Sequence, residues 1–135
     1  MAKCVVFLNG EYTYSQEYID RLFDSKTVLF CADGGANYAY KYKKNPMYII
    51  GDLDSIDKDV LEYFENKNVH IEKHNPEKDY TDFELILKKI EQLEKEKTIK
   101  FSVVNILGAL GKRIELTLSN IFLMEKYKKI IILKI

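Results

Sequence analysis

Acidic side chains gather where apolar runs of this chain end. The run at residues 28–32 leads into Asp33, and the run at 47–50 leads through a glycine into Asp52 and Asp54. In an open parallel sheet, ligands bind at the carboxyl ends of the strands. Carboxylates gathered at such an edge repel one another unless a cation neutralises them. The spacing therefore predicts a Mg²⁺ site that serves a phosphorylated substrate, because Mg²⁺ prefers oxygen ligands.

A third acidic cluster opens a helical stretch. Asp79, Asp82 and Glu84 surround Thr81 in the sequence. Thr81 followed three residues later by Glu84 is a capping-box pattern, and acids in a first turn also complement the helix dipole. Capping alone is therefore one interpretation of this cluster. Because two acids beyond the cap exceed what capping needs, a role in a functional site is the other.

Two glycine-bearing segments, residues 33–37 and 108–113, each follow an apolar run and precede a helical pattern. Glycines at such a place let backbone N–H groups approach a phosphate. Lys112 and Arg113 oppose the dipole of the helix that follows, so a bound anion explains them better than stability does. A plain turn is the alternative for both segments. Neither segment is a dinucleotide fingerprint or a P-loop.

Apolar runs alternate with amphipathic stretches along the whole chain. The runs are nearly continuous in apolar residues, which is typical of parallel strands buried on both faces. We therefore expect an α/β fold, a doubly wound, mostly parallel, Rossmann-like sheet of about six strands with helices on both faces, in one domain over residues 1–135. The expected strands are 3–8, 27–32, 47–50, 69–72, 101–107 and 129–135, and the expected helices follow Ser15, span 37–44 and 57–66, follow Thr81 and span 116–126.

Composition excludes several classes of protein. Lys+Arg and Asp+Glu are both 21, so the zero net charge gives no support for binding nucleic acid or an anionic membrane. Cys4 and Cys31 lie in apolar runs without metal-ligand spacing, which indicates buried thiols and a reducing, cytoplasmic compartment. From the residues at the start of the chain and the lengths of its apolar runs, we expect neither a signal peptide nor a membrane span. His70 and His74 have no partner pattern for nucleophilic catalysis.

Taken together and in this order, four segments resemble the N-terminal catalytic domain of the thiamine pyrophosphokinases. They are residues 32–37, 51–55, 78–84 and 108–121. The resemblance implies a transferase that moves a pyrophosphoryl group from ATP to the hydroxyl of thiamine, releasing AMP, with Mg²⁺ as cofactor. It also implies a homodimer and a C-terminal β-rich domain that contributes to thiamine binding. That domain is expected to be absent from residues 1–135.

The resemblance also implies roles for individual residues. Asp52, Asp54 and Asp82 are expected to hold Mg²⁺ and, with Arg113 and Glu115, to act in catalysis. The residues expected to bind nucleotide or substrate are Asp33, Gly34, Gly35, Asn37, Ser55, Asp79, Thr81, Gly108, Thr117 and Asn120.

The last motif departs from the family pattern. Residues 111–117 read Gly-Lys-Arg-Ile-Glu-Leu-Thr, whereas the family motif reads Gly-Gly-Arg-x-Asp-His-Thr. Glu115 keeps a carboxylate one methylene further out, and Leu116 has no polar function. Two other functions therefore stay open: a pyrophosphokinase acting on a pterin-type alcohol, and a non-catalytic nucleotide-binding module.

Overall fold

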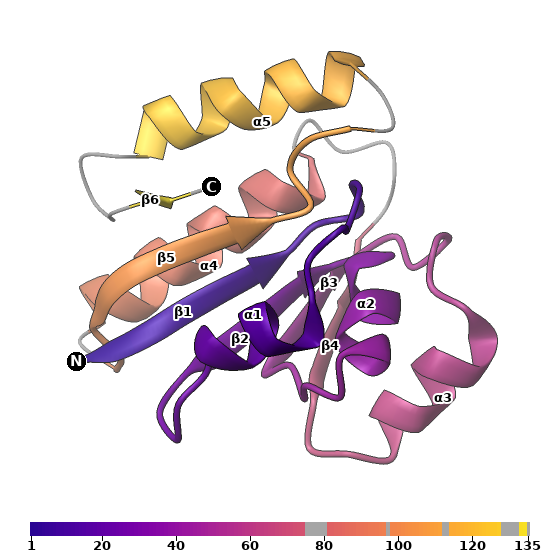
Figure 1. The fold of residues 1–135 in the computed structure, drawn as a ribbon. Coiled ribbons are helices and arrows are strands. Elements are labelled where there is room, and N and C mark those ends of the chain that lie inside the picture. The colour runs from indigo at the N-terminus through magenta and orange to yellow at the C-terminus, as the bar shows by residue number, and fades with distance from the viewer. Residues whose placement is uncertain (75–80, 97, 112–113, 128–132, 135) are drawn as a thin grey trace.

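Strands and helices alternate in the computed structural model, which describes residues 1–74, 81–96, 98–111, 114–127 and 133–134 (Figure 1). The strands are β1 (Ala2–Phe7), β2 (Val28–Ala32), β3 (Tyr48–Gly51), β4 (His70–Lys73), β5 (Phe101–Leu107) and β6 (Leu133–Lys134). The helices are α1 (Gln16–Arg21), α2 (Gly35–Lys41), α3 (Lys58–Glu65), α4 (Asp82–Lys95) and α5 (Ile114–Tyr127).

The six strands form one sheet in the order β4-β3-β2-β1-β5-β6, and every neighbouring pair is parallel. The chain starts near the middle of the sheet, adds β2, β3 and β4 on one side, and then returns to add β5 and β6 on the other. The strand order therefore reverses between β1 and β5. Such a reversal is the topological switch point at which open α/β sheets bind ligands. The predicted doubly wound α/β fold is confirmed.

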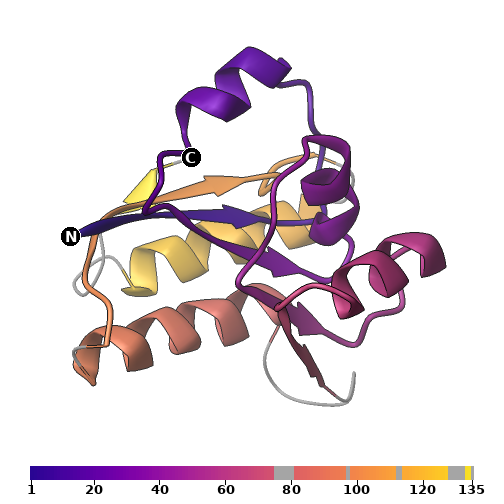
Figure 2. The ribbon, with the colours of Figure 1, turned by 90° about the horizontal axis from the view of Figure 1, so that it is seen from below.

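Helices cover both faces of the sheet (Figures 1 and 2). Successive side chains of a strand point to opposite faces. Cys4 and Val6 of β1 pack in the cluster that includes α4 and α5, and Val5 and Phe7 pack with α1, α2 and α3. All four side chains are fully buried, which explains why this strand is apolar on both sides.

The start of α4 differs in part from the capping box that the sequence predicts. The Thr81 hydroxyl accepts from the Glu84 N–H at 3.2 Å, so the cap itself forms. The buried Glu84 carboxylate instead accepts from Lys126 Nζ at 2.7 Å and from the Tyr127 hydroxyl at 3.0 Å. Glu84 therefore ties the first turn of α4 to the last turn of α5, which a local motif could not reveal.

Most element boundaries agree with the sequence prediction within two residues. The largest difference is α2, which begins at Gly35 and ends at Lys41 rather than spanning 37–44, because the helix starts directly in the glycine turn. Most of the strand predicted at 129–135 lies outside the described residues, and its described part, β6, pairs with β5. Cys4 and Cys31 are free and buried, as predicted. Among the described helices, none has the length and apolar character needed to span a membrane.

Candidate active site

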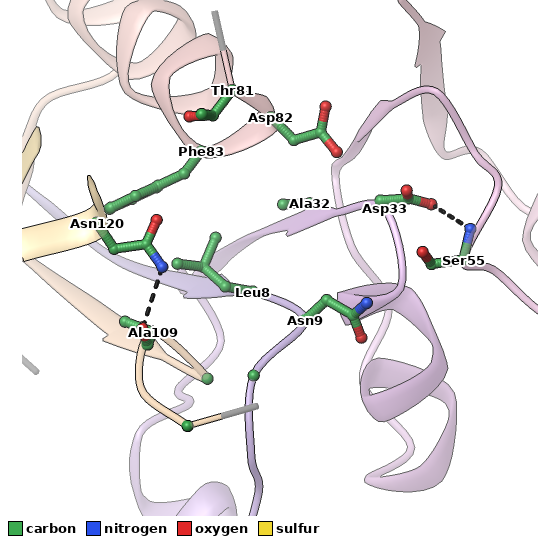
Figure 3. Close-up of a pocket in the computed structure, with 13 residues that line it drawn as sticks. Leu8, Asn9, Ala32, Asp33, Ser55, Thr81, Asp82, Phe83, Ala109 and Asn120 are labelled. Carbon is green, nitrogen blue, oxygen red and sulfur yellow. Dashed lines mark hydrogen bonds between the residues drawn. The ribbon is translucent and has the colours of Figure 1, made fainter. Parts of the chain in front are cut away.

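Three carboxylates from separate parts of the chain converge. Asp33 follows β2, Asp52 follows β3, and Asp82 is the first residue of α4. One carboxylate oxygen of each lies within 4.8 Å of those of the other two. Figure 3 shows the Asp82 side chain directed toward Asp33. Because the three residues come from different elements, the fold rather than a local motif assembles this group, called here the carboxylate group.

The backbone that holds the carboxylate group adopts unusual conformations. Asp33 and Leu53 have positive φ angles of 45° and 69°. Gly51 has φ 151°, and a Cβ added there would lie 2.8 Å from Asp82 Oδ2. Backbone strain of this kind concentrates at functional sites, where the surrounding structure holds it in place. Gly51 is thus required both by its conformation and by the close approach of Asp82.

Burial and mutual repulsion raise two pKa values in the carboxylate group. Burial raises the pKa of Asp33 to about 7, with further contributions from a hydrogen bond to Asp52 and the charges of Asp52 and Asp82. Burial and the Asp52 charge raise the pKa of Asp82 to about 6. The hydrogen bond with Asp33 lowers the pKa of Asp52. Below about pH 7, Asp33 in the metal-free protein is therefore mostly protonated, and Asp52 accepts its hydrogen bond.

A small hydrogen-bond network fixes the two loops that carry Asp33 and Asp52. The Asp33 carboxylate accepts from the Ser55 N–H at 3.1 Å. The Asn37 side chain donates to the Ser55 carbonyl and accepts from the Asp57 N–H, both at 3.0 Å. Asn37 therefore bridges the start of α2 to the loop that precedes α3. Both sequence-predicted residues, Asn37 and Ser55, lie beside the carboxylate group as supports of its loops.

The structure brings together two of the three expected metal ligands, Asp52 and Asp82. The third member of the carboxylate group is Asp33, and Asp54 lies outside it. The Asp54 N–H donates to Asp52 Oδ1 at 3.0 Å, and its side chain is exposed. β3 ends at Gly51, and Leu53, with its positive φ, turns the chain between Asp52 and Asp54.

A pocket of about 220 Å³ lies beside the carboxylate group, at the switch point between β1 and β5 (Figure 3). Six of the residues expected at the site line this pocket: Asp33, Ser55, Thr81, Asp82, Gly108 and Asn120. The Asn120 amide donates to the Ala109 carbonyl at 3.1 Å, which joins α5 to the loop after β5. These six residues therefore meet in one cavity although they are spread over 88 positions of the chain, from 33 to 120.

Seven further lining residues are not among the individually expected site residues: Leu8, Asn9, Gly10, Ala32, Phe83, Ala109 and Gly111. Ala109 and Gly111 lie in the glycine-bearing segment 108–113. Asn9 and Gly10 directly follow the strand expected at residues 3–8. Only the strand order reveals that this end faces the switch point, because β1 and β5 are neighbours despite their separation in the chain.

Of the remaining predicted residues, some are described but do not line the pocket, and the side chains of the others are not described. Gly34 and Gly35 form the start of α2, and the Thr117 hydroxyl donates to the Gly111 carbonyl at 3.3 Å. Asp79 and Arg113 lie outside the described residues, and Glu115 falls in the first turn of α5, where only the backbone is described.

Known proteins resemble this chain in sequence and in fold. A curated thiamine pyrophosphokinase 1 of Oryza sativa subsp. japonica is 28% identical over 96% of this chain and 53% of its own length. The crystal structure of the yeast thiamin pyrophosphokinase matches with a TM-score of 0.76 at 22% identity, covering 98% of this chain and 57% of that one. The Bacillus subtilis thiamine pyrophosphokinase structure gives a TM-score of 0.73 at 25% identity, covering 96% and 56%.

The chain spans about half the length of the curated relatives it matches. The model of the family described as "Thiamin pyrophosphokinase, catalytic domain" matches residues 19–134, which include the whole carboxylate group. The chain therefore belongs to the thiamine pyrophosphokinase family, through the family's catalytic domain.

Proposed function

We propose that this chain carries the catalytic site of a thiamine pyrophosphokinase. The site transfers a pyrophosphoryl group from ATP to the hydroxyl of thiamine, giving thiamine diphosphate and AMP. The observation that carries the proposal is the convergence of Asp33, Asp52 and Asp82 beside a pocket at the switch point. A homodimeric assembly, a cytoplasmic location and a separate β-rich thiamine-binding domain belong to the same proposal as predictions from the family resemblance.

The carboxylate group fits a Mg²⁺ ion. It offers hard oxygen donors from three directions, and a buried carboxyl with a raised pKa is a site where negative charge lacks a counterion. Asp33, Asp52 and Asp82 would hold the ion, and Asp33 would release its proton as the ion binds. When bound, Mg²⁺ neutralises phosphate charge and orients the phosphate oxygens.

Each side of the pocket has a different part in the reaction. The carboxylates would hold the metal ion, and with it the phosphates, near the ends of β2 and β3. The loops after β1 and β5 form the opposite side, where glycines allow a ligand to approach the backbone closely. The thiamine hydroxyl oxygen forms a bond to the β-phosphorus, and the bond from that phosphorus to the oxygen bridging the α-phosphate breaks. AMP leaves with the bridging oxygen, and the hydroxyl proton passes to solvent water. Positioning and electrostatic stabilisation provide most of the rate enhancement in such transfers.

An AMP-release assay tests this function. Purified protein is supplied with ATP and Mg²⁺, and with thiamine or a hydroxymethyl pterin as acceptor. We expect AMP release that depends on thiamine and is lost in Asp82→Asn. The matched control is Asp59→Asn, an exposed acid in the first turn of α3 outside the carboxylate group, which should keep full activity.

Three outcomes would overturn the proposal. AMP release with the pterin alone would indicate the related acceptor class. Nucleotide binding without AMP release, in a protein that includes any further domains of the natural chain, would indicate a non-catalytic module. Equal activity in wild-type protein and Asp82→Asn would remove the carboxylate group from the reaction.

A further inference from the structure

One tyrosine hydroxyl joins the two strands that meet at the switch point. Tyr12 Oη lies 2.6 Å from the Leu8 carbonyl and 3.2 Å from the Leu107 carbonyl. The single hydroxyl proton is thus shared between the ends of β1 and β5, with the shorter bond to Leu8. The Leu8 N–H also donates to the Leu107 carbonyl at 2.8 Å. The Tyr12 hydroxyl therefore adds a second link between the chain after β1 and the end of β5, beside the Leu8–Leu107 hydrogen bond.

The loops beyond these carbonyls form one side of the pocket. The Glu11 N–H donates to the Leu110 carbonyl at 3.0 Å, so residues 8–11 and 107–111 run together; we call these two segments the paired loops. A Cβ added at Gly108 (φ 72°) would lie 2.6 Å from Tyr12 Oη and 2.5 Å from the Leu8 carbonyl oxygen. Gly108 thus lies directly against the Tyr12 side chain, and Asn9, Gly10 and Ala109 line the pocket beside it.

The Tyr12 ring also contacts the opposite side of the site. It stacks on Tyr38 with ring centroids 3.8 Å apart and an interplanar angle of 13°. Tyr38 belongs to α2, the helix that starts two residues after Asp33. One side chain therefore touches both paired loops and the helix that follows the first carboxylate. Burial also raises the pKa of Tyr12 well above its usual range, so its hydroxyl remains a donor at neutral pH.

We propose that Tyr12 is a positioning residue for the nucleotide site. Its hydroxyl holds the paired loops in register with the carboxylate group, without lining the pocket itself. The inference rests on the proposed function, because the loops matter to catalysis only if this pocket binds the nucleotide. No role in the family resemblance is assigned to this residue or to the loop that contains it.

The test compares two tyrosine-to-phenylalanine variants from the same aromatic cluster. Tyr12→Phe removes the hydroxyl that joins the paired loops. Tyr42→Phe is the matched control, because the Tyr42 hydroxyl donates to the Tyr14 carbonyl at 2.8 Å and does not line the pocket. Each variant loses one hydroxyl bonded to a backbone carbonyl and keeps its ring. A purely structural effect would therefore appear equally in both.

Ligand affinity is the first measurement. With a non-hydrolysable ATP analogue and Mg²⁺, we expect Tyr12→Phe to weaken binding at least fivefold and to raise the KM for ATP more than it lowers kcat. Tyr42→Phe should stay within twofold of wild type, although both variants lower the melting temperature. Equal affinities in the two variants would overturn the inference.

Amide hydrogen exchange without ligand is the second measurement, and it does not depend on the proposed function. We expect exchange in the paired loops, including the Glu11 amide, to be at least tenfold faster in Tyr12→Phe than in Tyr42→Phe. Unchanged exchange in the loops would overturn the inference even if affinity changed. If wild-type protein bound no nucleotide, the proposed function would fail, and the exchange rates alone would decide whether Tyr12 holds the loops.

Discussion

The two sides of the pocket are built in opposite ways. The carboxylate group gathers like charges from two loops with positive φ angles and from the start of α4, and burial raises two of its pKa values. The paired loops carry backbone hydrogen bonds and close packing around glycines. The first arrangement opposes folding of the metal-free protein, and the second supports it. The site therefore combines negative charge that a cation would neutralise with a preformed side of the pocket for the ligand.

The largest expected effect breaks the carboxylate side. Asp52→Asn removes one negative charge from the proposed metal site. Mg²⁺-dependent binding of a non-hydrolysable ATP analogue should therefore weaken by at least about 100-fold, since even residues that only support a metal ligand contribute 10–100-fold in affinity. Isothermal titration calorimetry measures this. Asp54→Asn should have a smaller effect, because Asp54 lies outside the carboxylate group. Equal losses in the two variants would support the sequence prediction that Asp54 also holds the metal ion.

The next effect breaks the glycine side. Gly108→Ala places a side chain against Tyr12 and Leu8 at a φ of 72°, so it should destabilise the protein by about 3 kcal/mol. Urea unfolding followed by circular dichroism gives the free energy of unfolding. A loss below about 0.5 kcal/mol would show that the paired loops tolerate strain and are not the rigid wall described above.

How far the sequence predicts this molecule depends on the range of the contacts. The strand at Phe101–Leu107 and the helix caps at Ser15 and Thr81 follow from local patterns, and the structure confirms them. The doubly wound sheet follows from the alternation of such patterns. Local chemistry therefore suffices for the elements and for the strand ends at which ligands bind.

Contacts between distant segments explain what the sequence could not predict. Asp33 joins Asp52 and Asp82 in the carboxylate group, because the ends of β2 and β3 and the start of α4 meet there. Asn9 and Gly10 line the pocket only because β1 pairs with β5. Glu84 binds Lys126 and Tyr127 rather than its own helix end. Each of these depends on strand order or helix packing.

The pH dependence of protein stability is the next prediction, and it concerns the carboxylate side of the pocket. In the metal-free protein, the pKa values of Asp33 and Asp82, about 7 and about 6, exceed the ordinary value of 3.8. The folded protein therefore binds more protons than the unfolded chain between about pH 4 and pH 7, and these two groups make the free energy of unfolding fall as pH rises. Asp52, whose pKa is lowered, contributes in the opposite direction below that range.

Asp33→Asn should flatten this pH dependence. Urea midpoints measured at pH 5 and pH 7.5, without divalent ions, should differ less in the variant than in wild-type protein. The control is Asp59→Asn, which should keep the wild-type difference. An unchanged slope in Asp33→Asn would show that the carboxylate group carries no excess proton.

The smallest effect concerns two helix caps of the same chemistry. Ser15→Ala and Thr81→Ala each remove a hydroxyl that accepts from a backbone N–H, so each should lower stability by about 1 kcal/mol. Only Thr81→Ala should also weaken nucleotide binding, because α4 presents Asp82 to the carboxylate group. Thermal unfolding and the binding titration measure the two properties. Equal nucleotide affinity in both variants would show that the Thr81 cap does not contribute to the binding site.

A count of bound metal ions tests the central claim most directly. Mn²⁺ can replace Mg²⁺ at oxygen-ligand sites and is detected by electron paramagnetic resonance. Mn²⁺ affinity is measured in the presence of a non-hydrolysable ATP analogue. We expect wild-type protein to bind Mn²⁺ far more tightly than a variant in which Asp33, Asp52 and Asp82 are all changed to Asn. Binding that is equally tight in the triple variant, or no protein-bound Mn²⁺ in the wild type, would contradict the account.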